Sequence, residues 1–297
     1  YVSPNGSDNN SGSSSQPFAT WQKGVNVAAA GDIVYIRGGI YYTSGSLRTT
    51  GYCGVFIQNK NGTSDNLISI LAYPGEIPIL DCSGMTQSGD QHIGISIESS
   101  SYLHLKGLRI RNVKAASGYT ATGISTYRMN NSKLELISVS GTHGPGFGID
   151  GNNNLILNCD AFDNYDSQSG GEHGDGFIFG HNDSRTTNSL YGCRSWNNSD
   201  DGFDTYGNEG TIIWEKCWSF NNGYGSNGDG AGFKLGATHL TPLSTPQKVL
   251  INCLAANNKG IGFDQSEGNV LINLFNNTSF SNSRGFEFSS GGNLALV

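Results

Sequence analysis

The stretch CRSWNNSDDGFD, residues 193–204, contains both of the sequence patterns that decide the fold of this chain. It begins with the pattern Cys-x-x-aromatic-x-Asn and ends with a Gly-Phe pair followed by aspartate. The Gly-Phe pair recurs through the second half of the chain at intervals of 23 to 30 residues, and its phenylalanines are Phe147, Phe177, Phe203, Phe233, Phe263 and Phe286. A period of this length is the sequence signature of a solenoid, in which each unit buries its apolar face by stacking on its neighbours.

The Cys-x-x-aromatic-x-Asn pattern has nearly the same period. It occurs at Cys159, Cys193 and Cys217, recurs in altered form at Cys253, and has Asn277 in place of the cysteine in the next repeat. The segments that contain these cysteines, such as NLILNC and KVLINC, are short and rich in β-branched residues, which is typical of strands. We therefore predict an all-β parallel β-helix, in which equivalent residues stack about 4.8 Å apart. This stacking predicts a ladder of buried thiols inside the coil and ladders of asparagine at its bends.

We expect a single domain over residues 1–297, because all-β solenoids of this length are often one continuous fold. The N-terminal region differs from the repeats. Residues 17–30 have apolar side chains at helical spacing, so we predict an amphipathic helix there that covers the open edge of the first coil. The chain stops in an apolar segment at Val297 without a capping element, so we expect the natural protein to be longer.

Charge and composition exclude some classes of function. The net charge of −7 and the pI of about 5.3 argue against nucleic-acid binding, which depends on clustered lysine and arginine. No run of about 18 apolar residues is present, so we expect no membrane span. The chain begins at Tyr1 as a processed chain would, and we expect a monomer that is secreted or lies at the cell surface or in the periplasm. Six cysteines would also fit disulfide bonds, and the pairing state of Cys53 and Cys82 is left open.

Alignment of the repeats on phenylalanine brings acidic residues into register. The position after each phenylalanine is occupied in turn by Gly148, Ile178, Asp204, Lys234, Asp264 and Glu287. Because side chains alternate along a strand, this column points outward if phenylalanine points inward, and Lys234 then lies one coil from Asp204. Two positions before phenylalanine, Asp175 and Asp201 are neighbours in successive coils, and Asp200 is adjacent. We therefore expect these four carboxylates to converge on one outer face of about two coils.

Two interpretations of this acidic cluster are open. Each aspartate could accept hydrogen bonds from turn amides in a glycine-rich bend, or the carboxylates together could hold a cation that offsets their repulsion. A set of oxygen ligands without cysteine favours calcium over zinc. Four carboxylates in register beside one lysine favour the cation site.

Lys234 is also open to two interpretations. It could form an exposed charge ladder with Asp204 and Asp264, which would stabilise the fold little. Alternatively, a cation beside it would lower its pKa from the ordinary value of about 10.4 and make the amine a base. A cation and a base together suit abstraction of a proton alpha to a carboxylate. On a uronate sugar, loss of the C4 glycosidic oxygen then completes a β-elimination.

The motifs GDGF at 174–177, NSDDGFD at 198–204 and GFKLG at 232–236 resemble those of polysaccharide lyase family 9, the pectate-lyase-like right-handed parallel β-helices. The opening residues 1–42 are also similar to the N-terminal region of that family, although other secreted β-helices share this feature. The resemblance covers most of the chain, and the pair of motifs at 198–204 and 232–236 is its specific part.

The resemblance implies a function and a site. It implies a calcium ion held by Asp175, Asp200, Asp201 and Asp204, with Lys234 as the Brønsted base. It also implies a pectic substrate, either polygalacturonate or the galacturonate–rhamnose backbone of rhamnogalacturonan I. The motifs do not separate these two polymers, because both present a galacturonate to the metal and the base.

A groove for a polyanion needs cations and polar contacts along its length. Candidate substrate ligands near the site in sequence are His173, Arg185, Arg194, Tyr206, Lys259 and Arg284. Trp214 and Trp218 could stack on sugar rings, as Tyr206 could, although Trp218 also fits the packing of the solenoid itself. For each of the charged residues, a solvated surface charge is the simpler interpretation.

Two other functions fit the predicted architecture. A polygalacturonase-like glycoside hydrolase would use paired carboxylates as acid and base, and Asp200 and Asp201 could be such a pair. The Asn-Thr-Asp and Arg-Ile-Lys motifs of those hydrolases are absent from the sequence. A non-catalytic β-helical adhesin or carbohydrate-binding protein would use the aspartates structurally. We expect a calcium-dependent lyase.

Overall fold

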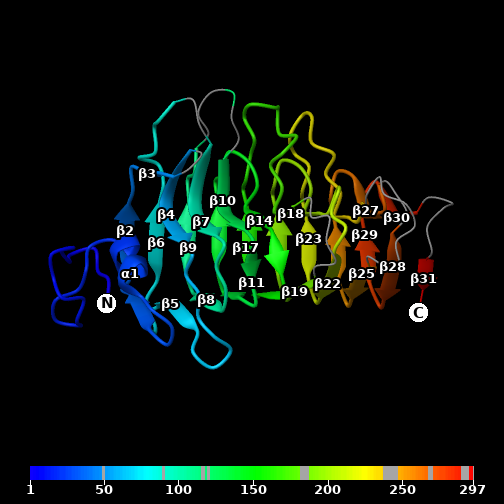
Figure 1. The fold of residues 1–297 in the computed structure, drawn as a ribbon. Helices are drawn as coiled ribbons and strands as arrows, with labels where there is room; N and C mark the ends of the chain where they lie inside the picture. Colours follow the sequence, from blue (N-terminus) through cyan, green and yellow to red (C-terminus); the bar gives the residue numbers. More distant parts are fainter. Residues whose placement is uncertain are drawn as a thin grey trace.

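Three parallel β-sheets form the walls of the computed structural model, and successive turns of the chain stack along one axis (Figure 1). The structure describes residues 1–48, 51–88, 91–114, 118, 121–180, 187–236, 247–266, 270–288 and 294–296. A full turn of the chain contributes one strand to each wall, so strands adjacent in a sheet come from successive turns and are parallel. The exception is an antiparallel pair between Ser46–Leu47 and Tyr52–Gln58. The two termini lie at opposite ends of the stack (Figure 1). This arrangement is the predicted parallel β-helix.

The three walls are named here sheet A, sheet B and sheet C. Sheet A contains β1 (Ile33–Ile36), β5 (Ile68–Ala72), β8 (Leu103–Lys106), β12 (Lys133–Glu135), β16 (Asn154–Leu157), β19 (Thr187–Tyr191), β22 (Thr211–Glu215), β25 (Gln247–Ile251), β28 (Leu271–Phe275) and β31 (Leu294–Leu296). Sheet B contains β2 (Gly39–Tyr42), β6 (Pro78–Asp81), β9 (Arg109–Arg111), β13 (Ser138–Ser140), β17 (Asp160–Phe162), β20 (Arg194–Trp196), β23 (Trp218–Phe220), β26 (Leu254–Ala256) and β29 (Thr278–Phe280). Sheet C contains β3 (Ser46–Leu47), β4 (Tyr52–Gln58), β7 (His92–Glu98), β10 (Ala121–Tyr127), β14 (Phe147–Ile149), β18 (Phe177–Phe179), β21 (Phe203–Asp204), β24 (Phe233–Lys234), β27 (Ile261–Asp264) and β30 (Arg284–Glu287). A small additional sheet pairs β11 (Met129–Asn130) with β15 (Gly151–Asn152).

The repeated phenylalanines form a ladder inside sheet C. Phe203 pairs with Phe177 on one side and with Phe233 on the other, and their rings are stacked with centroids 5.0 and 4.8 Å apart. These side chains are fully buried. The predicted register is therefore confirmed, and with it the pairing of Asp204 with Lys234 and of Lys234 with Asp264.

A ladder of asparagines fixes the bend that follows sheet B. The side-chain amide of Asn198 donates to Oδ1 of Asn222 at 2.9 Å, and that of Asn222 donates to Oδ1 of Asn258 at 3.0 Å. The same Oδ1 atoms also accept the backbone N–H of the preceding rung. Asn198 and Asn222 are buried, so the amides supply the hydrogen bonds that this turn of backbone needs away from water. The predicted asparagine ladder is confirmed.

The cysteine ladder is also present in the interior. Cys159, Cys193, Cys217 and Cys253 are buried free thiols, and burial raises the pKa of Cys159, Cys193 and Cys217 well above the ordinary value. Cys53 and Cys82 are buried free thiols as well.

The predicted N-terminal helix is shorter than residues 17–30. Helix α1 spans Trp21–Val27, because the Thr20 hydroxyl caps its first turn by accepting from the Lys23 N–H and the backbone becomes extended at Ala28. Before the helix, Phe18 forms a bridge to Val2 instead of joining it. The helix packs against β1 and β4 at the first coils, so it covers the end of the stack as expected.

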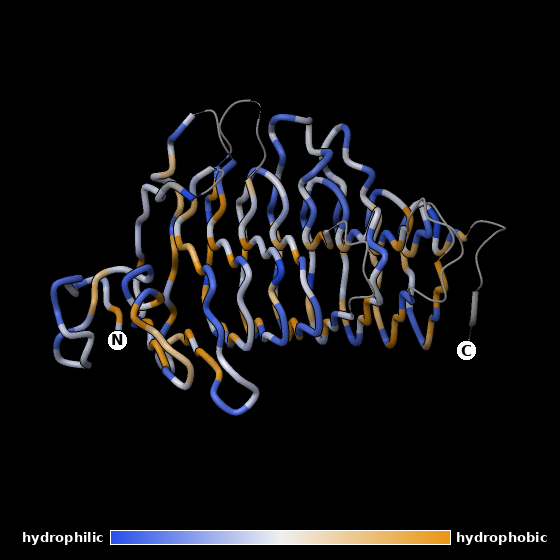
Figure 2. The backbone as a smooth tube through the Cα atoms, viewed as in Figure 1, coloured by the Kyte–Doolittle hydropathy of each residue, from blue (hydrophilic) through white to orange (hydrophobic). Residues whose placement is uncertain are grey.

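Polar segments concentrate in the longer connections between coils, whereas the apolar residues lie along the strands (Figure 2). The connections from sheet B to sheet C are long in the middle of the stack, as between β17 and β18 and between β23 and β24. The described residues contain no helix with the length and apolar character needed to cross a membrane.

A buried lysine stabilises the connection between β21 and β22. Lys248 on β25 is fully buried, and its Nζ donates to the carbonyl oxygens of Asn208 and Gly210 and to Oδ1 of Asn208 at 2.8–3.1 Å. Burial lowers the pKa of Lys248 to about 7 from the ordinary value of 10.5. This lysine therefore holds the turn that follows Asp204 and Tyr206.

Replacement of Asn222 by alanine removes two rungs of the asparagine ladder and leaves buried amides without partners. We expect a loss of about 2–4 kcal/mol in the free energy of unfolding, measured by urea denaturation. The exposed Asn9→Ala variant is the control and should lose less than about 0.5 kcal/mol. Equal stability of the two variants would show that the ladder does not support the fold.

Lys248→Met leaves three buried oxygen acceptors without their donor, and we expect it to lose about 2 kcal/mol or more. Because the pKa of Lys248 is lower in the folded state, the wild-type chain becomes more stable as the pH rises from about 7 to 10.5, and the variant lacks this gain. The difference in unfolding free energy between the two proteins should therefore grow from pH 7 to pH 10. A difference that is the same at all pH values would mean that Lys248 stays charged in the fold.

Candidate active site

A pocket of about 760 Å³ opens on sheet C, where β18, β21 and β24 lie side by side. Asp175 and Asp201 come two residues before β18 and β21, and Asp200 comes one residue earlier than Asp201. Asp204 and Lys234 end β21 and β24. The phenylalanine register places these residues together although they are as many as 59 positions apart in the sequence. The convergence of the predicted site residues is a consequence of the coil spacing.

Three carboxylates form a tight cluster at the base of this site. Asp175, Asp200 and Asp201 each contribute one oxygen, and these three oxygens lie within 4.8 Å of one another. Backbone amides from the next turn hold each carboxylate at Oδ1. The Asp201 N–H donates to Asp175, the Asp229 N–H to Asp200 and the Ala231 N–H to Asp201. The turn-amide interpretation is therefore correct for one oxygen of each residue, and the cluster exists in addition to it.

The cluster is more buried than the sequence suggested. Asp201 has no exposed surface, and it lies beneath the pocket rather than on an outer face. The connection between β23 and β24 lies against the cluster, since the Asp229 N–H donates to Asp200 and the Ala231 N–H donates to Asp201. The expectation of four carboxylates on an outer face is therefore wrong for Asp201, which is buried against this connection and against Lys234.

Burial raises the pKa of all three clustered aspartates. For Asp175 the charges of Asp204, Asp200 and Asp201 raise the pKa further, and for Asp200 the charge of Asp201 has the same effect. For Asp201 the neighbouring Lys234 partly offsets the effect of burial. A cluster that disfavours its own ionised form is stabilised by a positive charge placed among its oxygens.

Lys234 supplies one such charge. Its Nζ lies 3.0 Å from Oδ2 of Asp201, 3.2 Å from Oδ2 of Asp229 and 4.0 Å from Oδ2 of Asp204. Burial favours the neutral amine, but the charges of Asp201 and Asp204 outweigh this and raise the pKa of Lys234 above its ordinary value. Without a bound metal, Lys234 is therefore an ammonium ion, and its side chain is only 16% exposed.

The aspartate cluster fits a hard divalent cation. Oxygens separated by at most 4.8 Å can share one calcium ion, whose ligands lie at about 2.3–2.6 Å. Oδ2 of Asp201 is buried and has the Lys234 ammonium as its partner in the described residues, so its environment already favours a positive charge. The donor set contains carboxylates only, which is the chemistry of calcium or magnesium and not of zinc.

Two of the predicted substrate ligands line the same pocket. His173 and Tyr206 are both in its wall, and the Tyr206 ring lies 5.9 Å from Nζ of Lys234. Lys259 is not in the wall. Its Nζ donates to the carbonyls of Gly225 and Gly228 and so holds the loop that covers the cluster.

The remaining candidates lie elsewhere or outside the described residues. Arg194 is on β20 in sheet B, away from this pocket, and forms a salt bridge with Asp160. Arg284 on β30 pairs with Glu287. Arg185 lies outside the described residues.

The tryptophans named as stacking candidates differ in exposure. Trp214 is fully buried, so the expectation that it stacks on a sugar is wrong: its position on β22 points into the core. Trp218 is exposed on sheet B and is not part of the interior packing.

Sequence reasoning missed Asp229, which lies directly beside Lys234 and lines the pocket. The signal was an Asp-Gly pair, as at Asp175 and Asp201, but here two further residues, Ala231 and Gly232, separate Asp229-Gly230 from Phe233. That insertion moves Asp229 out of the aligned column. Other wall residues, including Gln91, Thr122, Glu172 and Ser266, carry no repeat signal.

Comparison with known proteins agrees with this geometry. The family described as "Pel9A-like, right handed beta helix region" matches residues 1–293. Pectate lyase L of Dickeya chrysanthemi is 28% identical over 303 residues, which cover 98% of this chain and 67% of that protein.

Two solved structures are similar over the whole chain. Pectate lyase Pel9A gives a TM-score of 0.80 at 26% identity and covers 100% of this chain and 73% of its own. A rhamnogalacturonan lyase gives a TM-score of 0.86 at 31% identity and covers 100% of this chain and 84% of its own. The resemblance inferred from the three motifs is confirmed, as is the right-handed coil. The chain belongs to the Pel9A-like family of right-handed parallel β-helices, and it is a polysaccharide lyase.

Proposed function

We propose that the chain is a calcium-dependent lyase that cleaves galacturonate-containing pectic polysaccharide by β-elimination. The observation that carries this proposal is the position of the Lys234 amine, which lies 3.0 Å from a carboxylate of a buried three-aspartate cluster in an open pocket. The relatives named pectate lyase and rhamnogalacturonan lyase support the substrate class.

Asp175, Asp200 and Asp201 would hold the calcium ion, with Asp204 at the edge of the site. A calcium ion held there would supply positive charge, which would make the C5 proton of a bound uronate more acidic and would favour the neutral amine of Lys234 by offsetting the carboxylate charges that keep it protonated.

Lys234 then acts as the base. Its neutral Nζ takes the C5 proton, the electron pair of the broken C–H bond forms a double bond between C4 and C5, and the glycosidic oxygen at C4 leaves with the electron pair of the C4–O bond. That oxygen takes up a proton from water, and the Lys234 ammonium returns its proton to solvent. Tyr206 and His173 form the wall beside this amine and would contact the sugar. The Asp229 carboxylate accepts from the ammonium form of Lys234 at 3.2 Å, which orients the side chain between turnovers.

The proposed substrate is a polymer that lies outside cells, so we propose that the protein acts there. We also propose that it acts as a monomer. Polygalacturonate and the rhamnogalacturonan I backbone both present a galacturonate to this site, and both are included in the assays below.

The first test is the Lys234→Ala variant. We expect unsaturated product, measured by its ultraviolet absorbance, to form from one of the two polymers with the wild-type chain and to fall by a factor of about 100 or more in the variant, because the base is gone. Lys23→Ala, on helix α1, is the matched control and should keep full activity. Circular dichroism verifies that each variant is folded. A folded Lys234→Ala variant with normal turnover would refute the role of this amine, and polymer binding without turnover by the wild type would indicate a binding protein.

The second test is the Asp175→Asn variant, whose Oδ1 can still accept from the Asp201 N–H. The pKa of Asp175 is raised above the ordinary 3.8 in the folded chain, so without metal the wild type loses stability as the pH rises above about 4. In EDTA the variant should not show this loss. Its free energy of unfolding relative to that of the wild type should therefore rise by up to about 1.4 kcal/mol for each pH unit.

Added calcium should make the wild type more stable than Asp175→Asn, because the ion binds the folded wild type and binds the variant more weakly. The exposed Asp163→Asn variant is the control and should respond to calcium as the wild type does. If calcium stabilises Asp175→Asn as strongly as the wild type, the aspartate cluster is not the calcium site.

A further inference from the structure

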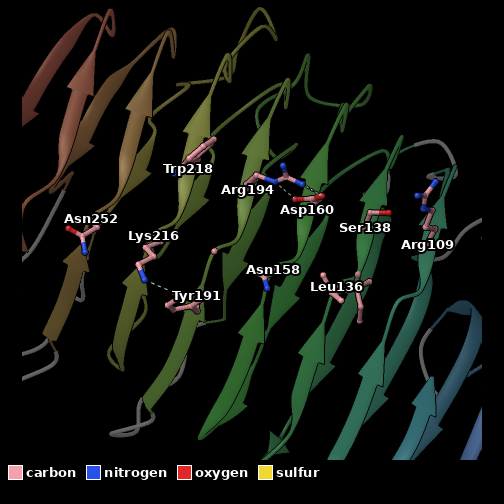
Figure 3. A pocket seen from close by; sticks show the side chains of 12 residues that line it. Arg109, Leu136, Ser138, Asn158, Asp160, Tyr191, Arg194, Lys216, Trp218 and Asn252 are labelled. Atoms are coloured by element: carbon pink, nitrogen blue, oxygen red, sulfur yellow. Dashed lines mark hydrogen bonds and ion pairs between the residues drawn. The ribbon is translucent and has the colours of Figure 1, made fainter. Parts of the chain in front are cut away.

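A second pocket, of about 620 Å³, lies on a different wall of the coil, where sheet A bends into sheet B (Figure 3). It shares no lining residue with the pocket that contains Lys234. Two rows of side chains cross the coils here. One row is contributed by the first residues of the sheet B strands, which pair in register as Arg109, Ser138, Asp160, Arg194 and Trp218. The other row is contributed by the adjacent bend and includes Leu136, Asn158, Lys216 and Asn252.

The pocket exposes apolar surface that the fold does not use. Trp218 is 48% exposed and Leu136 is 50% exposed, and both line this one pocket. Single exposed apolar residues are common on protein surfaces, but a tryptophan in a pocket with polar groups around it is a recognition feature. The flat indole ring offers a packing surface for the apolar C–H face of a sugar ring.

The polar groups of the pocket are mainly cationic, although the chain carries a net charge of −7. Arg109, Arg194 and Lys216 line it, and Asp160 is the one carboxylate among its lining residues. Asp160 accepts from Nε and Nη2 of Arg194 at 2.8 and 2.7 Å, which fixes the guanidinium toward Asp160, one coil beyond the strand that pairs with Trp218 (Figure 3). Lys216 donates to the Tyr191 hydroxyl at 2.5 Å and lies 4.7 Å from the centre of that ring. These contacts hold two of the cations in place before any ligand arrives.

We propose that this pocket is a second binding site, for an acidic polysaccharide of the same uronate class that the catalytic pocket cleaves. The proposal rests on the proposed function for the identity of the polymer. A uronate ring packs on Trp218 while its carboxylate reaches Arg194, one coil away at about 4.8 Å, and further sugars extend toward Lys216 and Arg109. Binding at a second wall keeps the enzyme on the polymer network between catalytic events, because two sites on one protein raise its effective concentration at the polymer.

The repeat itself supplies variants that preserve the fold, because each coil shows which side chain a position tolerates. Trp218→Leu introduces the residue that Leu254 places at the same register in the next coil. Lys216→Asn introduces the side chain of Asn252, and Arg109→Ser that of Ser138. Phe280→Ala is the matched control, since Phe280 is an exposed aromatic residue of sheet B outside the pocket and Ala256 occupies its register in the preceding coil.

The experiment is native gel electrophoresis through gels that contain polygalacturonate, rhamnogalacturonan I or neutral galactan, with EDTA to remove calcium from the catalytic site. We expect retardation of the wild type by an acidic polymer and not by galactan. Trp218→Leu and the double variant Arg109→Ser/Lys216→Asn should weaken this binding about fivefold or more. Phe280→Ala should bind as the wild type does. Unchanged binding by both pocket variants, or equal retardation by galactan, would overturn the proposal.

Cleavage in calcium of two short soluble substrates, an oligogalacturonate and an oligosaccharide of rhamnogalacturonan I, separates this inference from the proposed function, because such substrates need the catalytic pocket alone. All four proteins should cleave one of the two, and at the same rate. If no protein cleaves either substrate but polymer binding still depends on Trp218, the proposed function fails and the second site stands. If every protein cleaves one of them and polymer binding does not depend on Trp218, the lyase stands and the second site fails.

Discussion

The in-register stacking of successive coils is the constraint on which the rest of this structure depends. A strand spacing of about 4.8 Å brings together residues that are one repeat apart in sequence, whatever the length of the intervening connection. The stacked phenylalanines and the asparagine ladder fix that register from inside the coil. Asp204 and Lys234 are paired for this reason alone, and the aspartate cluster follows from the same alignment.

The site brings three acidic side chains together in a buried position, which is unfavourable for a folded protein. Three buried aspartates with raised pKa values are unfavourable in a fold that must also remain stable. The lysine beside them lowers this cost in the metal-free chain, and a divalent cation would lower it further. In the proposed mechanism, the same arrangement connects metal binding to catalysis, since the negative charge that keeps Lys234 protonated is the charge that a cation would offset.

The sequence predicts those features of the structure that the repeat determines. The phenylalanine columns predicted the pairing of Asp204 with Lys234 and the neighbourhood of Asp175 and Asp201, because periodicity alone sets them. The burial of Asp201 and the position of Asp229 could not be predicted, since both depend on how non-repeating connections fold over the cluster. The wall occupied by Arg194 was predictable but was missed, because Arg194 follows Cys193 as Trp218 follows Cys217, and this column of the repeat lies in sheet B rather than beside the aspartates.

The most direct test of the central claim is a crystal structure of the Lys234→Ala variant with calcium and an oligosaccharide of the polymer that the wild-type chain cleaves. The account predicts an ion within about 2.3–2.6 Å of oxygens from Asp175, Asp200 and Asp201, bound also to a substrate carboxylate. It further predicts that C5 of that sugar faces the truncated side chain at position 234. An ion bound at another site, or a C5 proton directed away from that position, would contradict the account.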